Sequence, residues 1–278
     1  MILGVRAHDF GKTSPVELAG RISAKGFTCV QLPLSKAVHG IDTGPGRLNP
    51  GLAGYIRDVF AEHNLKIAVL GCYINPVHPD PQIRRKDLER FKEHLRYVRD
   101  FGCSIVGTET GSVNPGQPFP PGNHSEETFQ ILLDSVAELV AEAEKFGVIM
   151  GIEGVVKEPL STPEKIKRLI DTIKSNNLQI IYDPANLISA ANYEKQDEIY
   201  QKSFALFGDR IVIIHAKDFV IENGKKELVQ VGKGILNYEL LLKLIKTRKP
   251  LINVLLEGAT PDNAVECGEY LKRVYAQV

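Results

Sequence analysis

Short apolar runs alternate with longer amphipathic stretches along the chain. Four runs share one form and lead to an acidic or imidazole side chain: VIMGIEG, LQIIYD, IVIIHAKD and INVLLEG lead to Glu153, Asp183, His215 and Glu257. Unbroken apolar runs are typical of strands buried on both faces, as in a parallel sheet. Ligands bind at the carboxyl ends of such strands, so these polar residues are candidates for a functional site.

Eight strands are predicted, and helical segments alternate with them. The strands are Ile2–Ala7, Phe27–Leu32, Lys66–Gly71, Ser104–Gly107, Val148–Ile152, Leu178–Tyr182, Ile211–Ile214 and Leu251–Leu256. Strict alternation implies a parallel sheet with right-handed crossovers. Since 278 residues is close to the ~250 typical of a (β/α)8 barrel, we predict an α/β fold with a single TIM-barrel domain over residues 1–278. An open doubly wound sheet is the alternative, but AHDFGK after the first strand lacks its Gly-rich fingerprint.

Local signals set several boundaries of these elements. Ser14, followed by a proline, is expected to cap the first helix, and Asn64 suits the left-handed residue that ends the next one. A long Gly/Pro loop is expected at residues 111–122. Glu222–Gly224 predicts a hairpin turn, and Thr260–Asp262 is expected to cap the final helix.

Charge and cysteine content exclude several classes of protein. The formal net charge is +0, so no basic excess indicates nucleic-acid binding. The four cysteines lack CxxC or disulfide-like spacing, which favours reduced, buried thiols and a cytoplasmic location. No segment approaches ~20 apolar residues, and the first apolar stretch is too short for a signal peptide. We expect no nucleic-acid or membrane partner; the oligomeric state stays open, a homo-oligomer included.

The four strand-end residues have the chemistry of a metal site. In a closed barrel they come from successive strands and converge at one side of the mouth. Three carboxylates that share a pocket raise one another's pKa unless a cation lies between them. Three oxygen donors and one imidazole suit one divalent ion, with Mn²⁺ our first choice and Mg²⁺, Co²⁺ or Zn²⁺ as alternatives. The competing interpretation is a set of unrelated polar strand ends.

The motif order resembles the xylose-isomerase-like superfamily, which comprises sugar isomerases, ketose 3-epimerases and the endonuclease IV (AP endonuclease family 2) proteins. The residues that carry the resemblance are Glu153, Asp183, Asn186, His215, Asp218 and Glu257. The segment VGKGILNYELLLKL also resembles that superfamily's Gly-x-Gly-x-(Ile/Leu)-(Asp/Asn)-aromatic stretch. The resemblance covers nearly the whole chain.

The resemblance implies that Glu153, Asp183, His215 and Glu257 bind one divalent metal, and that the two glutamates are the catalytic acid/base pair. A metal chelated by a substrate carbonyl and its neighbouring hydroxyl acidifies the carbon between them. One carboxylate then takes the proton to give an enediolate, and the other returns it. Asp218 would accept a hydrogen bond from an imidazole or orient a ligand. The expected activity is isomerisation or epimerisation of a small sugar, a polyol-derived ketose or a sugar acid.

The chain also departs from the pattern of its relatives. Asn186 stands where many epimerases have histidine, and Gln31 stands where relatives often have glutamate at the end of the second strand. Endonuclease IV carries extra histidine and aspartate ligands for three zinc ions, whereas FVIENGKKELVQVGKG after Asp218 contains no histidine. These departures argue against a trinuclear phosphodiesterase site.

Further polar residues near strand ends are candidates for substrate binding. The full set is His8, His78, Glu109, Lys157, Asn186, Lys217 and Asp218. The histidines and Glu109 would contact sugar hydroxyls from the opposite wall, and the lysines would reach a phosphate or carboxylate; a surface or loop role is the alternative for each. Lys233, between two glycines, is more simply part of a turn than of a phosphate site. The other histidines, His39, His63, His94 and His124, are expected on the surface.

Three other functions compete with the isomerase hypothesis. A lyase or dehydratase could use the same enediolate to expel a β-hydroxyl, and product analysis would separate the two. An endonuclease-IV-like phosphodiesterase would need a basic surface, which the net charge of +0 argues against. A sugar-binding barrel without activity would bind sugar equally well without metal.

Overall fold

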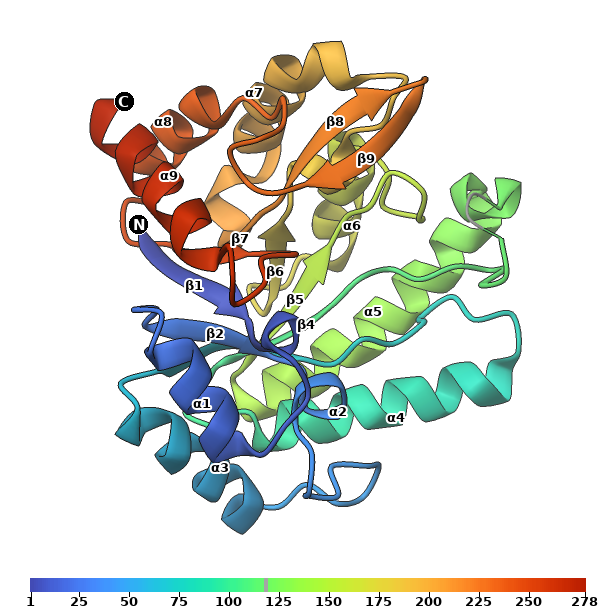
Figure 1. Cartoon of the computed structure of the whole chain (residues 1–278). Coiled ribbons are helices and arrows are strands. Elements are labelled where there is room, and N and C mark those ends of the chain that lie inside the picture. The colour runs from blue at the N-terminus through green and yellow to red at the C-terminus, as the bar shows by residue number, and fades with distance from the viewer. Residues whose placement is uncertain (118–119) are drawn as a thin grey trace.

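Eight parallel strands close into a barrel, with helices around its outer side (Figure 1). This computed structural model describes residues 1–117 and 120–278, so part of the expected loop at 111–122 lies outside the described residues. The barrel order is β1-β10-β7-β6-β5-β4-β3-β2. The strands are β1 (Ile2–Arg6), β2 (Cys29–Leu32), β3 (Lys66–Gly71), β4 (Ile105–Thr108), β5 (Ile149–Glu153), β6 (Leu178–Tyr182), β7 (Ile211–Ala216) and β10 (Asn253–Leu256). The predicted barrel is therefore confirmed, with strand ends displaced by at most two residues.

The helices begin and end largely where the cap signals indicate. They are α1 (Pro15–Ser23), α2 (Leu34–Ala37), α3 (Pro50–Glu62), α4 (Pro81–Tyr97), α5 (Glu126–Phe146), α6 (Pro163–Ile173), α7 (Gln196–Phe207), α8 (Tyr238–Arg248) and α9 (Ala264–Gln277). Ser14 accepts a hydrogen bond from the Glu17 amide, and Asn64 has the expected left-handed conformation, with φ of 58°. The predicted start of the last helix is wrong: α9 begins at Ala264, after Asn263 and not after Thr260–Asp262. Asn263 Oδ1 accepts from the Thr260 amide and closes a turn ahead of the helix.

The barrel interior is a packed core. A Cβ atom at Gly107 would lie 2.6 Å from Ile181 Cδ1, and one at Gly151 would lie 3.0 Å from the same atom. These glycines therefore leave room for the Ile181 side chain. Because the centre is filled, the carboxyl ends of the strands are where a substrate can approach.

A two-stranded hairpin extends from the carboxyl end of β7. Its strands β8 (Asp218–Glu222) and β9 (Lys225–Val229) pair antiparallel. The predicted turn is confirmed, since Asn223 and Gly224 have φ of 50° and 73°, which suits a two-residue hairpin loop. Figure 1 shows this hairpin beyond the barrel strands.

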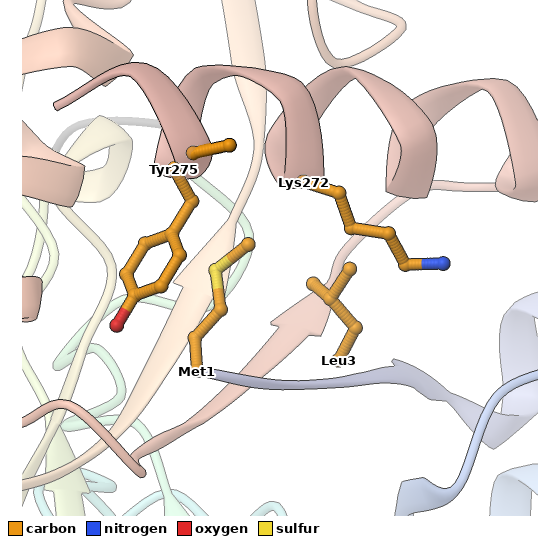
Figure 2. A pocket seen from close by; sticks show the side chains of 5 residues that line it. Met1, Leu3, Lys272 and Tyr275 are labelled. Atoms are coloured by element: carbon orange, nitrogen blue, oxygen red, sulfur yellow. The ribbon is translucent and has the colours of Figure 1, made fainter.

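The amino-terminal end of the barrel holds a small hollow between β1 and α9 (Figure 2). Its volume is about 180 Å³, and its lining includes Met1, Leu3, Lys272 and Tyr275. This end of a barrel serves stability rather than chemistry. The four cysteines are free and buried, as expected. In the described part of the chain, no helix has the length and apolar character to cross a membrane.

Candidate metal centre

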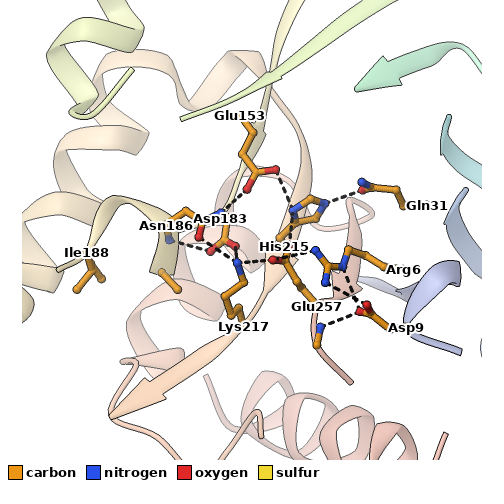
Figure 3. A network of polar contacts seen from close by, with 12 residues as sticks. Arg6, Asp9, Gln31, Glu153, Asp183, Asn186, Ile188, His215, Lys217 and Glu257 are labelled. Carbon is orange, nitrogen blue, oxygen red and sulfur yellow. Dashed lines mark hydrogen bonds and ion pairs between the residues drawn. The ribbon is translucent and has the colours of Figure 1, made fainter. Parts of the chain in front are cut away.

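The four predicted ligands meet at the carboxyl end of the barrel (Figure 3). Glu153 ends β5, Asp183 directly follows β6, His215 lies in β7, and Glu257 directly follows β10. One donor atom from each lies within 4.8 Å of the others. Within residues 1–117 and 120–278, no other group of three or more His, Cys, Asp or Glu side chains brings donor atoms together in this way.

The orientation of the His215 ring suits a metal ligand. Nδ1 lies 3.2 Å from Glu153 Oε2 and 3.2 Å from Glu257 Oε2. On the other side of the ring, Nε2 donates to Gln31 Oε1 at 2.7 Å, and Gln31 Nε2 donates to the Tyr73 hydroxyl at 2.7 Å. A ligating histidine usually donates its other N–H in this way, which fixes the ring and directs the lone pair at the metal.

Two buried atoms in the cluster lack hydrogen-bond partners. They are His215 Nδ1 and Asp183 Oδ2. Asp183 Oδ2 has Lys217 Nζ 3.2 Å away, but the pair does not meet hydrogen-bond geometry. Unsatisfied buried polar atoms are rare and need an explanation such as an ion. One imidazole nitrogen and three carboxylates are ligands that a divalent cation accepts, so the residues fit such an ion.

The protein's own cations balance part of the negative charge. Burial opposes charge on the imidazole, but Glu153 and Glu257 outweigh it and raise the pKa of His215 to about 10. Burial also opposes ionisation of Glu257, yet His215, Lys217 and Arg6 hold its pKa well below the usual range. Burial raises the pKa of Asp183. A bound cation would therefore replace the proton on His215.

Lys217 and Asn186, which the sequence analysis gave as candidates for substrate binding, contact the ligand cluster itself. Lys217 Nζ is paired with Asp183 and Glu257 and donates to Asn186 Oδ1 at 3.0 Å. Asn186 Nδ2 in turn donates to Glu153 Oε1 at 2.6 Å. The two residues thus connect three of the four ligands.

Arg6 is a site residue that the sequence analysis missed. Its Nη1 lies 2.9 Å from Glu257 Oε1, and Asp9 accepts two further hydrogen bonds from its guanidinium, each 3.1 Å long. Arg6 is the last residue of β1. The strand-end rule that selected the four ligands would also have selected it.

Asp218 has partners other than those expected. Its carboxylate accepts hydrogen bonds from four backbone amides of the chain around β8, those of Phe219, Gly232, Gly234 and Leu236, at 2.8 to 3.1 Å. It therefore organises a loop instead of orienting an imidazole. Lys233 lies in a turn, the simpler of its two interpretations: Asp218 accepts from the amides of both flanking glycines, and Lys233 Nζ pairs with Glu266 at 2.8 Å.

The remaining candidates for substrate binding are His8, His78, Glu109 and Lys157, and the structure places them in three different surroundings. His8 contacts the Tyr73 ring edge-on at 6.3 Å between centroids, and burial, aided by Arg6, lowers its pKa to about 4. His78 lies near the start of α4, where its Nδ1 accepts from the Asp80 amide at 3.1 Å; the structure does not bring it to the cluster. Glu109 and Lys157 line a cavity beside the ligands.

This cavity has a volume of about 890 Å³ and lies between the cluster and the β8–β9 hairpin. Glu109, Asn186 and Lys217 line its inner part, and Lys226 and Leu228 of the hairpin line its outer part. Burial, together with the Glu153 carboxylate, raises the pKa of Glu109 to about 8. The cavity size is in the roughly 300–1,000 Å³ range of small-molecule sites.

Fold and site together define a (β/α)8 barrel with a candidate metal centre at its carboxyl end. Residues 20–273 match the family described as xylose isomerase-like TIM barrel, and the chain belongs to this family. An uncharacterized protein of Methanocaldococcus jannaschii is 23% identical over 235 residues, which cover 82% of this chain and 76% of that protein.

Solved structures have the same fold. A D-tagatose 3-epimerase-like protein superposes with a TM-score of 0.79 at 20% identity, covering 100% of this chain and 98% of that one. A xylose isomerase-like TIM barrel protein from Mycobacterium smegmatis, in complex with magnesium, has a TM-score of 0.76 at 16% identity, with 99% and 97% covered.

Proposed function

We propose that this protein is a divalent-metal-dependent isomerase or epimerase of a small sugar, a polyol-derived ketose or a sugar acid. The observation that carries the proposal is the position of His215 Nδ1, which lies 3.2 Å from a carboxylate oxygen of Glu153 and of Glu257. Two glutamates that flank one metal position can act on the same substrate carbon from different sides.

Glu153, Asp183, His215 and Glu257 would hold the ion. When bound, a divalent cation supplies Lewis-acid polarisation of a substrate carbonyl, which acidifies the adjacent C–H group. One glutamate, as the carboxylate, takes this proton as the substrate C–H bond breaks. The other glutamate, in its protonated form, donates a proton to the opposite face of that carbon or to the neighbouring carbon. Asn186 and Lys217 hold the carboxylates in place through the contacts described above.

The two glutamates have unequal surroundings, as an acid/base pair requires. Arg6 and Lys217 both contact Glu257, whereas Asn186, a neutral donor, contacts Glu153 Oε1. The positive charges of Arg6 and Lys217 favour the ionised form of Glu257.

The name of a structural relative supports the chemistry, since one is a D-tagatose 3-epimerase-like protein. The magnesium in the Mycobacterium smegmatis protein supports a divalent ion. The proposal names neither a single substrate nor a single metal, so its test covers a panel of both.

Exchange of substrate C–H protons with solvent tests this function. Protein stripped with a chelator and reloaded with Mn²⁺ is incubated in D₂O with ketoses and sugar acids, and deuterium incorporation is followed by NMR. Glu153→Gln and Glu257→Gln should each lower the exchange rate by roughly 10²- to 10⁴-fold. Glu269→Gln is the control, because Glu269 is exposed and pairs with Lys272 on α9.

Two results would count against the proposal: exchange that persists in the chelator, or exchange that neither active-site substitution slows. Product analysis in the same samples separates isomers from dehydrated products, which would indicate a lyase instead.

A further inference from the structure

The outer part of the cavity carries lysines without acidic partners. Lys157, Lys225 and Lys226 all line it, and within the described residues none has a carboxylate oxygen within 4.0 Å. Lys217, at the inner end, differs because Asp183 and Glu257 neutralise it. Glu227 also lines the cavity but pairs with none of the three lysines, so a net positive charge remains there to attract a ligand.

Lys226 is held in a defined position. Its Nζ donates to the backbone carbonyls of Ala185 and Ile188, the latter at 3.0 Å, and lies 4.8 Å from the centre of the Phe219 ring. An ammonium group has three N–H donors, so one remains for a ligand. The two carbonyls belong to the segment after β6 that also bears Asp183 and Asn186, which fixes Lys226 relative to the metal centre.

The charge of Lys226 is only partly compensated. Burial lowers its pKa to about 8; the charges of Asp183 and Glu257 oppose this lowering, whereas those of Lys217 and Lys157 add to it. A buried charge is costly unless it is paired. An anion beside Lys226 would supply the missing pair.

The cavity is larger than the reacting part of a sugar requires. Its volume of about 890 Å³ lies near the upper end of the roughly 300–1,000 Å³ range of small-molecule sites. Apolar side chains of Val155, Ile188 and Leu228 also line it. A substrate can therefore extend from the ligand cluster to the lysines.

We propose that the substrate carries an anionic group, a carboxylate or a phosphate ester, which Lys226 and Lys157 bind at the outer end of the cavity while its hydroxy-carbonyl end lies at the ligand cluster. This inference rests on the proposed function and narrows its substrate class to acidic sugars.

Binding of three related compounds to the Mn²⁺-loaded protein tests the inference. D-fructose, D-fructuronate and D-fructose 6-phosphate share one skeleton and differ at C6. Isothermal titration calorimetry should show at least one acidic compound bound roughly 10- to 100-fold more tightly than D-fructose, the gain expected of a hydrogen bond to a charged group. The better of the two identifies the anion as carboxylate or phosphate. Equal or weaker binding of both acids would overturn the inference.

Substitutions then assign the effect to the two lysines. Lys157→Met removes an exposed side chain, and Lys226→Gln removes the charge but keeps an N–H donor for the two carbonyls. Each should lower the affinity for the acidic compound about tenfold and that for D-fructose less than about twofold. Lys243→Met, on the exposed face of α8, controls for the change in net charge. If both cavity variants still bound the acidic compound more tightly than D-fructose by the wild-type factor, the inference would be contradicted.

The outcome is distinguishable from failure of the proposed function. If proton exchange occurs equally with neutral and acidic sugars, and the lysine variants bind both as wild type does, the function stands and the inference fails. If acidic compounds bind through the two lysines but no compound exchanges protons, the anion site stands and the proposed function fails.

Discussion

At the scale of single residues, Gln31 decides how the metal centre is organised. Its side chain lies in β2 and is only 2% exposed. When Nδ1 of a neutral His215 faces the carboxylates, Nε2–H is the one N–H that the ring can donate, and the amide oxygen of Gln31 accepts it. Gln31 is neutral, so this contact requires an acceptor but does not require a negative charge.

Replacing Gln31 with leucine should weaken metal binding. Without an acceptor for Nε2, the ring loses its fixed orientation, and removal of such a partner typically costs 10- to 100-fold in metal affinity. Calorimetric titration of the stripped protein with Mn²⁺ measures the change. Gln31→Glu keeps an acceptor and should retain wild-type affinity or exceed it. Equal affinity in the leucine variant would show that Gln31 has no such role.

His94 corrects an expectation at this scale, because it is buried at 5% exposure instead of lying on the surface. Its Nδ1 contacts the Arg90 carbonyl oxygen at 2.8 Å within α4. Nothing in the local sequence distinguishes it from the exposed histidines; only the packing of α4 against the barrel does.

Burial lowers the pKa of His94 below its ordinary value, so stability should depend on pH. In the unfolded chain histidine binds a proton near pH 6.5, whereas folded His94 resists protonation. Above about pH 6.5 the neutral form of His94 costs the folded protein nothing. As the pH falls below this value, the free energy of unfolding should decrease, by no more than about 1.4 kcal/mol per pH unit for this one group. In urea unfolding between pH 7.5 and 5, His94→Gln should show a shallower loss than wild type. Exposed His39→Gln should follow wild type; parallel curves for all three proteins would contradict the assignment.

At the scale of elements, the segment after the β8–β9 hairpin depends on one carboxylate. Asp218 is buried at 1% exposure and binds four amides, while a Cβ at Gly234 would lie 2.1 Å from its Oδ1. The Gly-x-Gly stretch is thus explained by close approach to Asp218 and, at Gly232, by a φ of 88°.

Asp218→Ala should destabilise the protein by at least about 3 kcal/mol, because buried amides lose a charged acceptor. Asp218→Asn keeps one acceptor oxygen and should cost less. Chemical unfolding measures both, with the exposed Asp262→Ala as control. A loss for Asp218→Ala no larger than that of the control would show that the loop folds without this anchor.

The elements themselves were largely predictable, since their signals are local. The apolar runs fixed the strands, and Ser14, Asn64 and the Asn223–Gly224 turn behave as the cap and turn rules require. The four-residue helix α2 (Leu34–Ala37) was missed, because so short a helix has no periodicity to detect. Lys226 was also missed, since it acts through contacts distant in sequence. Arg6 was missed although it ends β1, where the strand-end rule applies.

At the scale of the whole molecule, the candidate metal centre and the packed core occupy separate parts of the barrel. The ligands occupy the carboxyl end of the barrel, whereas side chains such as Ile181 fill its interior. The four ligands were predictable because barrel closure converts strand order into proximity. Their tuning by Lys217, Asn186 and Gln31 was not, because it depends on side-chain directions.

Binding of Mn²⁺ should therefore raise the melting temperature of a protein that is already folded. At 100 times the dissociation constant the gain is about 2.7 kcal/mol, or roughly 5–10 °C for a chain of this size. Differential scanning fluorimetry with and without chelator measures it. Asp183→Asn should stay folded and lose the shift, and a full shift in that variant would exclude Asp183 as a ligand.

The pairing of β1 with β10 closes the barrel, and the Arg6–Glu257 contact spans that seam. The binding site therefore cannot exist until the last strand has joined the first. On the ribosome, β10 and Glu257 must be synthesised before the four candidate ligands can meet. A nascent or prematurely terminated polypeptide that lacks β10 would carry three of the four without assembling the site.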